Sequence, residues 1–353
     1  MNFASDNVTG VAPEIMEALA RANRDAAMPY GADGATERLT GLFADAFETD
    51  VAVFPVATGT AANALGLSVM TPPYGAIYCH AESHVNSDEC GAPEFYTGGA
   101  KLIAMDGAHG KIGAADLDAR LRAAGAGDVH HVQPAAVSLT QATEAGTVYT
   151  PAEIGAVTET ARAHKLGVQM DGARFANALV HLDVSPADIT WRAGVDALSF
   201  GATKNGAMAA EAVVLFKPEL ADTFGFRRKR AAHLFSKMRF LSAQLEAYLA
   251  DGLWLRLARH ANAMAARLAK GLAAVPGVEL LHPVEANELF LTLPGRMADG
   301  LLAEGFVFYR LAEGDRLLIR LVTAFNTEAF DVDAFIAAAQ CLGADKQQRR
   351  TGS

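Results

Sequence analysis

Two apolar stretches, each ending in a turn that carries a charged side chain, decide the fold. The first reads Ala197-Leu198-Ser199-Phe200-Gly201-Ala202-Thr203-Lys204-Asn205-Gly206, an apolar strand pattern that runs into a glycine-flanked turn with one lysine. The second reads Val168-Gln169-Met170-Asp171-Gly172-Ala173-Arg174, in which a similar strand delivers an acid at its end. Near-continuous apolar strands of this length are typical of a parallel sheet that is covered on both faces.

Similar runs occur along the preceding and following sequence, with helical patterns between them. Strands are predicted at residues 51–56, 76–80, 101–105, 135–140, 167–170, 196–200 and 211–216. Helical spacing of apolar residues is clear at 36–47 and at 151–164. This alternation predicts an α/β fold with a mostly parallel, seven-stranded type of sheet wrapped by helices.

The pattern changes after residue 216, which indicates a second domain. A long helical stretch covers residues 229–275 with a break near Asp251-Gly252. Short strands at 278–281, 288–293, 306–309 and 316–322 then mix with helices at 296–303 and 327–340. The chain has 353 residues, and domains usually contain about 100–200. We therefore expect a large domain over residues 1–250, a smaller α+β domain over 251–345 and a disordered tail over 346–353.

Composition limits the partners and the location of the chain. The net charge of −10 disfavours nucleic acid as a partner, and no run approaches the roughly 20 apolar residues that span a bilayer. The first residues lack the pattern of a signal peptide, so a cytoplasmic location is expected. Cys79, Cys90 and Cys341 form no zinc pattern or disulfide framework, and no metal site is expected. The basic run at 226–230 is open to two interpretations, a solvated helix face or a contact with a small phosphate.

Three segments fall at predicted strand ends, where open α/β sheets bind their ligands. Lys204 lies in an apolar region in which a lysine amine can become nucleophilic. Asp171 precedes it by 33 residues (204 − 171 = 33), which leaves room for one crossover and one strand, although an acid in this position can also be a helix N-cap. The third segment, Ala57-Thr58-Gly59-Thr60-Ala61-Ala62-Asn63, can offer backbone N–H groups to a phosphate. A lysine, an acid and a phosphate cradle are together what pyridoxal phosphate requires.

With these segments in place, the chain resembles the low-specificity L-threonine aldolases, pyridoxal-phosphate enzymes of the aspartate-aminotransferase fold (fold type I), and is closest to their pseudomonad-type branch. The resemblance runs from Phe3-Ala4-Ser5-Asp6-Asn7 to Ile319-Arg320-Leu321-Val322-Thr323. Its most specific parts are Tyr30-Gly31-Ala32-Asp33, Ser83-His84-Val85-Asn86-Ser87-Asp88-Glu89-Cys90-Gly91-Ala92-Pro93-Glu94, Asp171-Gly172-Ala173-Arg174 and Lys237-Met238-Arg239.

The resemblance implies a role for each matching residue. Lys204 is the Schiff-base lysine, Asp171 pairs with the pyridine nitrogen, and His84 stacks on the cofactor ring. Three further groups follow from the family. Thr58, Gly59 and Thr60 lie at the phosphate, and Ser5, Arg174 and Arg320 lie at the substrate carboxylate. Tyr30 and Lys229 reach the site of a neighbouring subunit, where Lys229 is a cofactor-binding residue. The implied assembly is a homotetramer built from catalytic dimers. The implied activity is cleavage of L-threonine, L-allo-threonine and related β-hydroxy amino acids to glycine and an aldehyde.

One position departs from the family pattern. Many members carry a second active-site histidine in the turn that here reads Leu139-Thr140-Gln141-Ala142-Thr143-Glu144, and this turn has no histidine. We expect His84 to accept the hydroxyl proton, directly or through a water, with Asp88 one helical turn later to orient the imidazole. The alternative for this pair is a structural hydrogen bond with ring stacking alone.

Two other functions remain open on the sequence. A β-eliminating lyase or an aminotransferase of the same fold would use the same residues for the cofactor, and only its products would distinguish it. A non-catalytic phosphate-binding protein would use the turn at 58–60 without needing Lys204. It would lack the yellow colour of a pyridoxal phosphate that is bound to lysine as an imine.

Overall fold

The structure, a computed structural model, describes residues 1–312 and 316–350. Its large sheet has seven strands in the order β1-β7-β6-β5-β4-β2-β3. Neighbours are parallel except at β7, which runs antiparallel to β1 and to β6. All seven predicted strands are present, with ends shifted by at most two residues: β1 Ala52–Val56, β2 Gly75–His80, β3 Lys101–Met105, β4 Gln133–Thr140, β5 Gly167–Gly172, β6 Ala197–Gly201 and β7 Glu211–Leu215.

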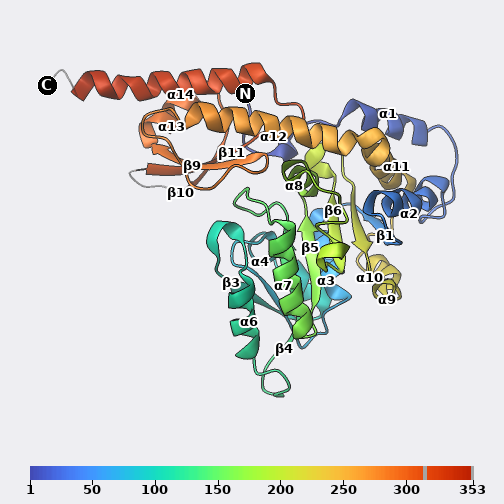
Figure 1. The fold of residues 1–353 in the computed structure, drawn as a ribbon. Coiled ribbons are helices and arrows are strands. Elements are labelled where there is room, and N and C mark those ends of the chain that lie inside the picture. Colours follow the sequence, from blue (N-terminus) through green and yellow to red (C-terminus); the bar gives the residue numbers. More distant parts are fainter. Residues whose placement is uncertain (313–315, 351–353) are drawn as a thin grey trace.

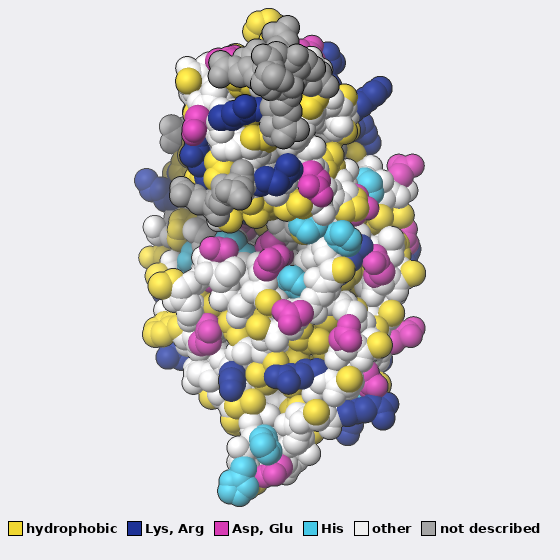
Figure 2. Space-filling model, turned by 90° about the vertical axis from the view of Figure 1, so that its left-hand side faces the viewer, with side chains coloured by type: hydrophobic (Ala, Val, Ile, Leu, Met, Phe, Trp, Pro, Cys, Tyr) yellow, Lys and Arg dark blue, Asp and Glu magenta, His cyan; other side chains and the backbone are white. Residues whose placement is uncertain are grey.

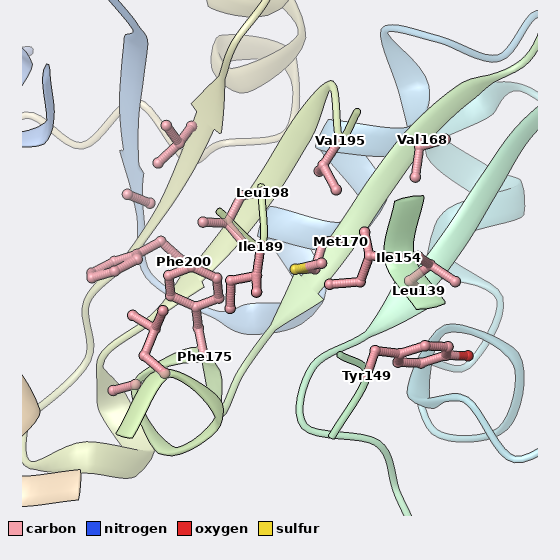
Figure 3. Close-up of a cluster of buried hydrophobic side chains, with 14 of the residues drawn as sticks. Leu139, Tyr149, Ile154, Val168, Met170, Phe175, Ile189, Val195, Leu198 and Phe200 are labelled. Carbon is pink, nitrogen blue, oxygen red and sulfur yellow. The ribbon is translucent and has the colours of Figure 1, made fainter. Parts of the chain in front are cut away.

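Both faces of this sheet are covered, as continuous apolar strands require. Successive side chains of β6 alternate between two cores: Leu198 and Phe200 pack on one face, and Ala197 packs on the other. The first core includes α2 (Gly34–Phe47), α7 (Pro151–Ala163) and α8 (Phe175–Leu182), and the second includes α3 (Gly59–Ser68). Figure 3 shows part of the first core, where Phe200 and Phe175 lie beside Leu198, Ile189 and Met170.

The remaining helices surround the sheet or extend from it (Figure 1). They are α1 Pro13–Ala22, α4 His84–Ser87, α5 Ala92–Thr97, α6 Ala114–Arg122, α9 Pro218–Ala221, α10 Phe224–Arg230, α11 Arg239–Leu249, α12 Leu253–Leu272, α13 Gly295–Ala303 and α14 Ala329–Arg350.

The long helical stretch expected at 229–275 is divided more than predicted. The break at Asp251 and Gly252 is confirmed, because both residues have positive φ values, 51° and 65°. A second interruption separates α10 from α11 and was missed. Ala232 has a φ of 63° there, a left-handed conformation that ends a helix. Alanine rarely adopts this conformation, so the sequence carries no signal of a helix end at this position.

The C-terminal region has its own antiparallel sheet, in the order β10-β11-β9-β8. The strands are β8 Glu279–Leu280, β9 Glu288–Pro294, β10 Tyr309–Ala312 and β11 Arg316–Val322. The strand predicted at 306–309 starts later, since Phe306 and Phe308 pack into the hydrophobic core of the C-terminal region instead. Phe3 also lies in this core and contacts Phe335 at 5.3 Å between ring centroids, so the N-terminal segment packs on the C-terminal region although the sequence places it with the first domain.

The tail expected at 346–353 is helical through Arg350, and residues 351–353 lie outside the described part. Figure 1 shows α14 and α12 side by side above the large sheet. Within residues 1–312 and 316–350, the helices are all too short or too polar to cross a bilayer. On the face seen in Figure 2, lysine and arginine side chains are scattered among acidic ones.

Candidate active site

A cavity of about 260 Å³ opens at the carboxyl end of the parallel strands. Its walls come from the turns after β1, β4, β5 and β6 and from the start of antiparallel β7, which lies at the same edge. The lining includes seven residues predicted for the site, namely Thr58, Gly59, Thr60, His84, Asp171, Arg174 and Lys204. The parallel topology therefore brings together groups that lie far apart in the sequence.

The first turn of α3 forms one wall of the cavity. Thr58 is the N-cap, and its hydroxyl accepts a hydrogen bond from the backbone N–H of Ala61 at 3.2 Å. A helix start leaves further N–H groups without an intrahelical acceptor. A Cβ added at Gly59 would meet no heavy atom within 4 Å, so open space lies before these donors, as an anion would need.

Asp171 is buried at the end of β5, 3% exposed. One carboxylate oxygen accepts from Asn63 Nδ2 at 2.7 Å and the other from the backbone N–H of Ala173 at 3.0 Å. The second hydrogen of Asn63 Nδ2 goes to Glu89 at 2.8 Å, and the Asn63 oxygen accepts from Gln169 at 3.0 Å. A chain of buried polar groups therefore fixes the position of this carboxylate.

Lys204 lies in a short 3-10 turn, Thr203–Asn205, whose neighbours are anchored. The side chain of Asn205 donates to the Tyr248 hydroxyl at 2.7 Å and to the Trp254 carbonyl at 2.9 Å. The backbone N–H of Ala202 donates to Glu211 at 2.9 Å. The backbone of the turn is therefore held in place, and the side chain of Lys204 lines the cavity.

The ends of strands β5 and β6, which lead to Asp171 and Lys204, pack against each other at very short range. A Cβ at Gly201 would lie 2.6 Å from the backbone oxygen of Ala173, and one at Gly172 would lie 2.6 Å from that of Ser199. Only glycine fits at these two positions without displacing backbone.

His84 is half-buried on the cavity wall, and its support differs from the prediction. Its Nδ1 lies 2.9 Å from Glu89 Oε1, and this hydrogen bond raises the pKa of His84. Asp88 is exposed and accepts instead from Ser87. The backbone N–H of Asp88 still donates to the His84 carbonyl at 2.9 Å, but Asp88 is the C-cap of α4 and its φ of −125° departs from the helix, and its side chain is exposed. The prediction of Asp88 as the orienting acid is therefore corrected to Glu89.

Arg174 is already surrounded by carboxylates. Its guanidinium contacts Asp6 at 2.8 Å and Glu288 at 2.9 Å. Burial alone would raise the pKa of Asp6, but the Arg174 charge holds it below its ordinary value. The Nε of Arg320 is buried without a hydrogen-bond partner. Ser5 is the N-cap of the 3-10 turn Asp6–Val8 and accepts from Asn7. Neither Arg320 nor Ser5 lines the cavity.

Tyr30 and Lys229 lie away from this chain's cavity and contact each other. The Lys229 ammonium lies 4.7 Å from the centre of the Tyr30 ring, and Tyr30 is 50% exposed.

Sequence reasoning missed three acids and one amide of this site: Asp6, Glu89, Glu144 and Asn63. Asn63 and Glu89 stand inside motifs that were singled out, but nothing in their spacing shows that they face each other. Glu144 follows the buried strand β4. Because ligands bind at the ends of such strands, this position could have indicated Glu144 as a site residue.

Comparisons with known proteins agree with this geometry. Residues 2–294 match the family model described as beta-eliminating lyase. The chain is 47% identical to a low specificity L-threonine aldolase of Pseudomonas aeruginosa, over 87% of this chain and 88% of that one. A solved threonine aldolase from Leishmania major superposes with a TM-score of 0.91 at 30% identity, covering 97% of this chain and 99% of that chain. A serine palmitoyltransferase of Sphingomonas wittichii, at 14% identity and a TM-score of 0.72 over 98% of this chain and 87% of that one, shares the fold.

Proposed function

The chain belongs to the beta-eliminating lyase family, and we propose that it is a pyridoxal-phosphate-dependent aldolase that cleaves L-threonine, L-allo-threonine and related β-hydroxy-α-amino acids to glycine and an aldehyde. The observation that carries this proposal is the convergence of Lys204, Asp171 and the start of α3 on one cavity.

The residues present fit pyridoxal phosphate. The amine of Lys204 would hold it covalently as a Schiff base, and the buried carboxylate of Asp171 would keep its ring nitrogen protonated. The start of α3, with Thr58, Gly59 and Thr60, would receive the phosphate. When bound, the cofactor supplies an acceptor for the electron pair released at the substrate's Cα.

We propose that residues at the cavity wall and behind it orient the substrate. Arg174 lines the cavity, and Arg320 has a buried Nε without a partner, so these two arginines and Ser5 would hold the substrate carboxylate. Such a grip sets the torsion about Cα and selects which bond breaks. Two side chains of the wall are able to take the β-hydroxyl proton, the imidazole of His84 and the carboxyl group of Glu144.

Assembly and location complete the proposal. We propose a cytoplasmic homotetramer of catalytic dimers in which Tyr30 and Lys229 reach a neighbouring subunit's site. The exposure of Tyr30 outside its own cavity, together with that of Phe226, 79% exposed, supports a covering partner. Neither a nucleic acid nor a membrane is part of the proposed function.

Product analysis tests the proposal. The purified protein is incubated with L-threonine, L-allo-threonine and L-phenylserine, and glycine, aldehyde, ammonia and 2-oxo acid are quantified. Equal amounts of glycine and aldehyde are expected. Ammonia with a 2-oxo acid would instead establish an eliminating lyase of the same fold, and transfer of the amino group to an added 2-oxo acid would establish an aminotransferase.

A further inference from the structure

Glu144 occupies an unusual position in the turn between β4 and α7. Its Oε1 accepts a hydrogen bond from the backbone N–H of His84 at 2.7 Å, which fixes the side chain. Its Oε2 is buried and has no hydrogen-bond partner. The residue lines the cavity, so its carboxyl group, one oxygen of which has no partner, lies beside the space where the substrate would bind. Buried polar atoms are seldom left unpaired unless they serve a function.

The other acids that line the cavity are engaged. Both oxygens of Asp171 accept hydrogen bonds. Glu89 also has one buried oxygen without a partner, Oε2, while its Oε1 is shared by His84 and Asn63; Glu89 does not line the cavity. Glu211 lines it but accepts from the backbone of Ala202 with Oε2. Within the described residues, Glu144 is the lining acid that holds a buried oxygen without a partner.

Ionisation favours Glu144 over His84 as a proton acceptor. Burial and the nearby charge of Asp171 raise the pKa of Glu144 to about 7, so both of its forms are populated near neutral pH, where a general base works best. The pKa of His84 is raised by its hydrogen bond with Glu89. This favours the protonated imidazole, which has no free nitrogen lone pair to accept a proton. The titratable groups facing Glu144 are Asp171, Arg174, Cys79 and Tyr149, with His84 at its backbone.

We propose that the carboxylate of Glu144 receives the β-hydroxyl proton of the substrate, a role that rests on the proposed aldol cleavage. The proton moves from the hydroxyl oxygen to Glu144 Oε2, and the O–H electron pair becomes the second carbon–oxygen bond of the aldehyde. The Cα–Cβ bond breaks and leaves its electron pair with Cα. Cα later takes up a proton to complete glycine, and Glu144 returns its own proton to water. His84 then has the remaining role of packing against the cofactor ring.

The test separates cleavage from the steps that glycine also undergoes. Glycine has no β-hydroxyl group, so exchange of its α-proton with D₂O needs the cofactor and Lys204 but not the proposed acceptor. In the holoenzyme, Glu144→Gln should lower kcat for L-threonine about 10²–10⁴-fold, with a smaller change in KM. Glycine exchange and bound-cofactor absorbance should stay near wild type. Glu144→Asp should recover part of kcat.

Infrared difference spectra supply a readout that is independent of turnover. Burial raises the pKa of Glu211 to about 7 as well, so the wild type should show the bands of two carboxyl groups that titrate near pH 7. Glu144→Gln should lose one of them, the Glu144 band. Glu285→Gln is the matched control. Glu285 accepts a backbone N–H from Val148 at 2.8 Å and lies outside the cavity, so its variant should keep wild-type kcat and the band.

Three outcomes would overturn the role of Glu144. The first is wild-type kcat in Glu144→Gln. The second is equal loss of cleavage and glycine exchange, which would make Glu144 a structural residue. The third is a large kcat loss in His84→Phe while Glu144→Gln stays active. That result would identify the imidazole of His84 as the acceptor of the β-hydroxyl proton. A wild-type protein that exchanges glycine but cleaves no β-hydroxy amino acid would refute the proposed function itself.

Discussion

Asn63 Nδ2 donates to Asp171 Oδ2 at 2.7 Å. The same nitrogen donates to Glu89 at 2.8 Å, and Glu89 contacts His84 at 2.9 Å. One buried amide therefore connects the acid proposed for the ring nitrogen with the support of the imidazole proposed to cover the ring. The positions of these two side chains depend on each other through Asn63.

Replacement of Asn63 by leucine should weaken both the fold and cofactor retention. Each buried carboxylate would lose a hydrogen bond, at a cost of about 1–3 kcal/mol each. Urea unfolding and the absorbance retained after dialysis measure the two effects. Asn262→Leu is the control, because Asn262 bonds to Asn177 away from the cavity. It should lower stability without loss of cofactor, and equal cofactor retention in both variants would contradict this role of Asn63.

The support of His84 is tested by its titration. The hydrogen bond of Glu89 raises the pKa of His84 above the ordinary 6.5. Protonation of His84 therefore stabilises the fold below that ordinary value, and the contribution disappears as pH rises through the raised pKa. Glu89→Gln should lower the pKa of His84, measured by NMR of the imidazole. Asp88→Asn should leave it unchanged; the opposite pattern would restore Asp88 as the partner.

Arg174 is predicted to be essential for stability as well as for substrate binding. Arg174→Leu would leave Asp6 buried without its cation and Glu288 with Arg320 alone, at 3.8 Å, a loss of about 3–5 kcal/mol in the free energy of unfolding. Denaturant titration measures it. The control is Arg267→Leu, which breaks the exposed pair with Asp333 and should have little effect. Comparable stabilities of the two variants would show that the Arg174 cluster contributes no more than a surface ion pair.

Lys204→Ala should abolish turnover and the covalent attachment of the cofactor. Borohydride reduction followed by peptide mass analysis should find the cofactor on Lys204 in the wild type and on no peptide of the variant. A variant that still cleaves L-threonine at the wild-type rate would exclude Lys204 from the chemistry.

The large sheet was predictable because its strands carry continuous apolar runs that a doubly covered sheet requires. The same logic placed Lys204 and Asp171 at one edge, since both follow such strands. The partners of these residues were not predictable. Glu89 rather than Asp88 supports His84 because α4 stops after one turn, and sequence spacing does not show where so short a helix ends. Glu144 was hidden because its role depends on which of its oxygens lacks a partner, and this follows from tertiary packing alone.

The close packing of the β5 and β6 ends gives a stability prediction. Gly201→Ala would press a methyl group against the backbone of Ala173, at a cost of about 1–3 kcal/mol. Gly155→Ala is the control: it lies inside α7, and its Cβ meets no atom within 4 Å. That variant should be stabilised by about 0.5–1 kcal/mol. Thermal melts of the two proteins, together with their cofactor absorbance, check the difference.

The backbone contact at Gly172 and Gly201 also limits how this catalyst can be redesigned. The strands that lead to the amine and to the acid touch through their main chains at these ends, so neither strand end can be shifted alone. New specificity is therefore easier to obtain by replacing Ala142 of the β4–α7 turn, which faces the same chamber without sharing that contact.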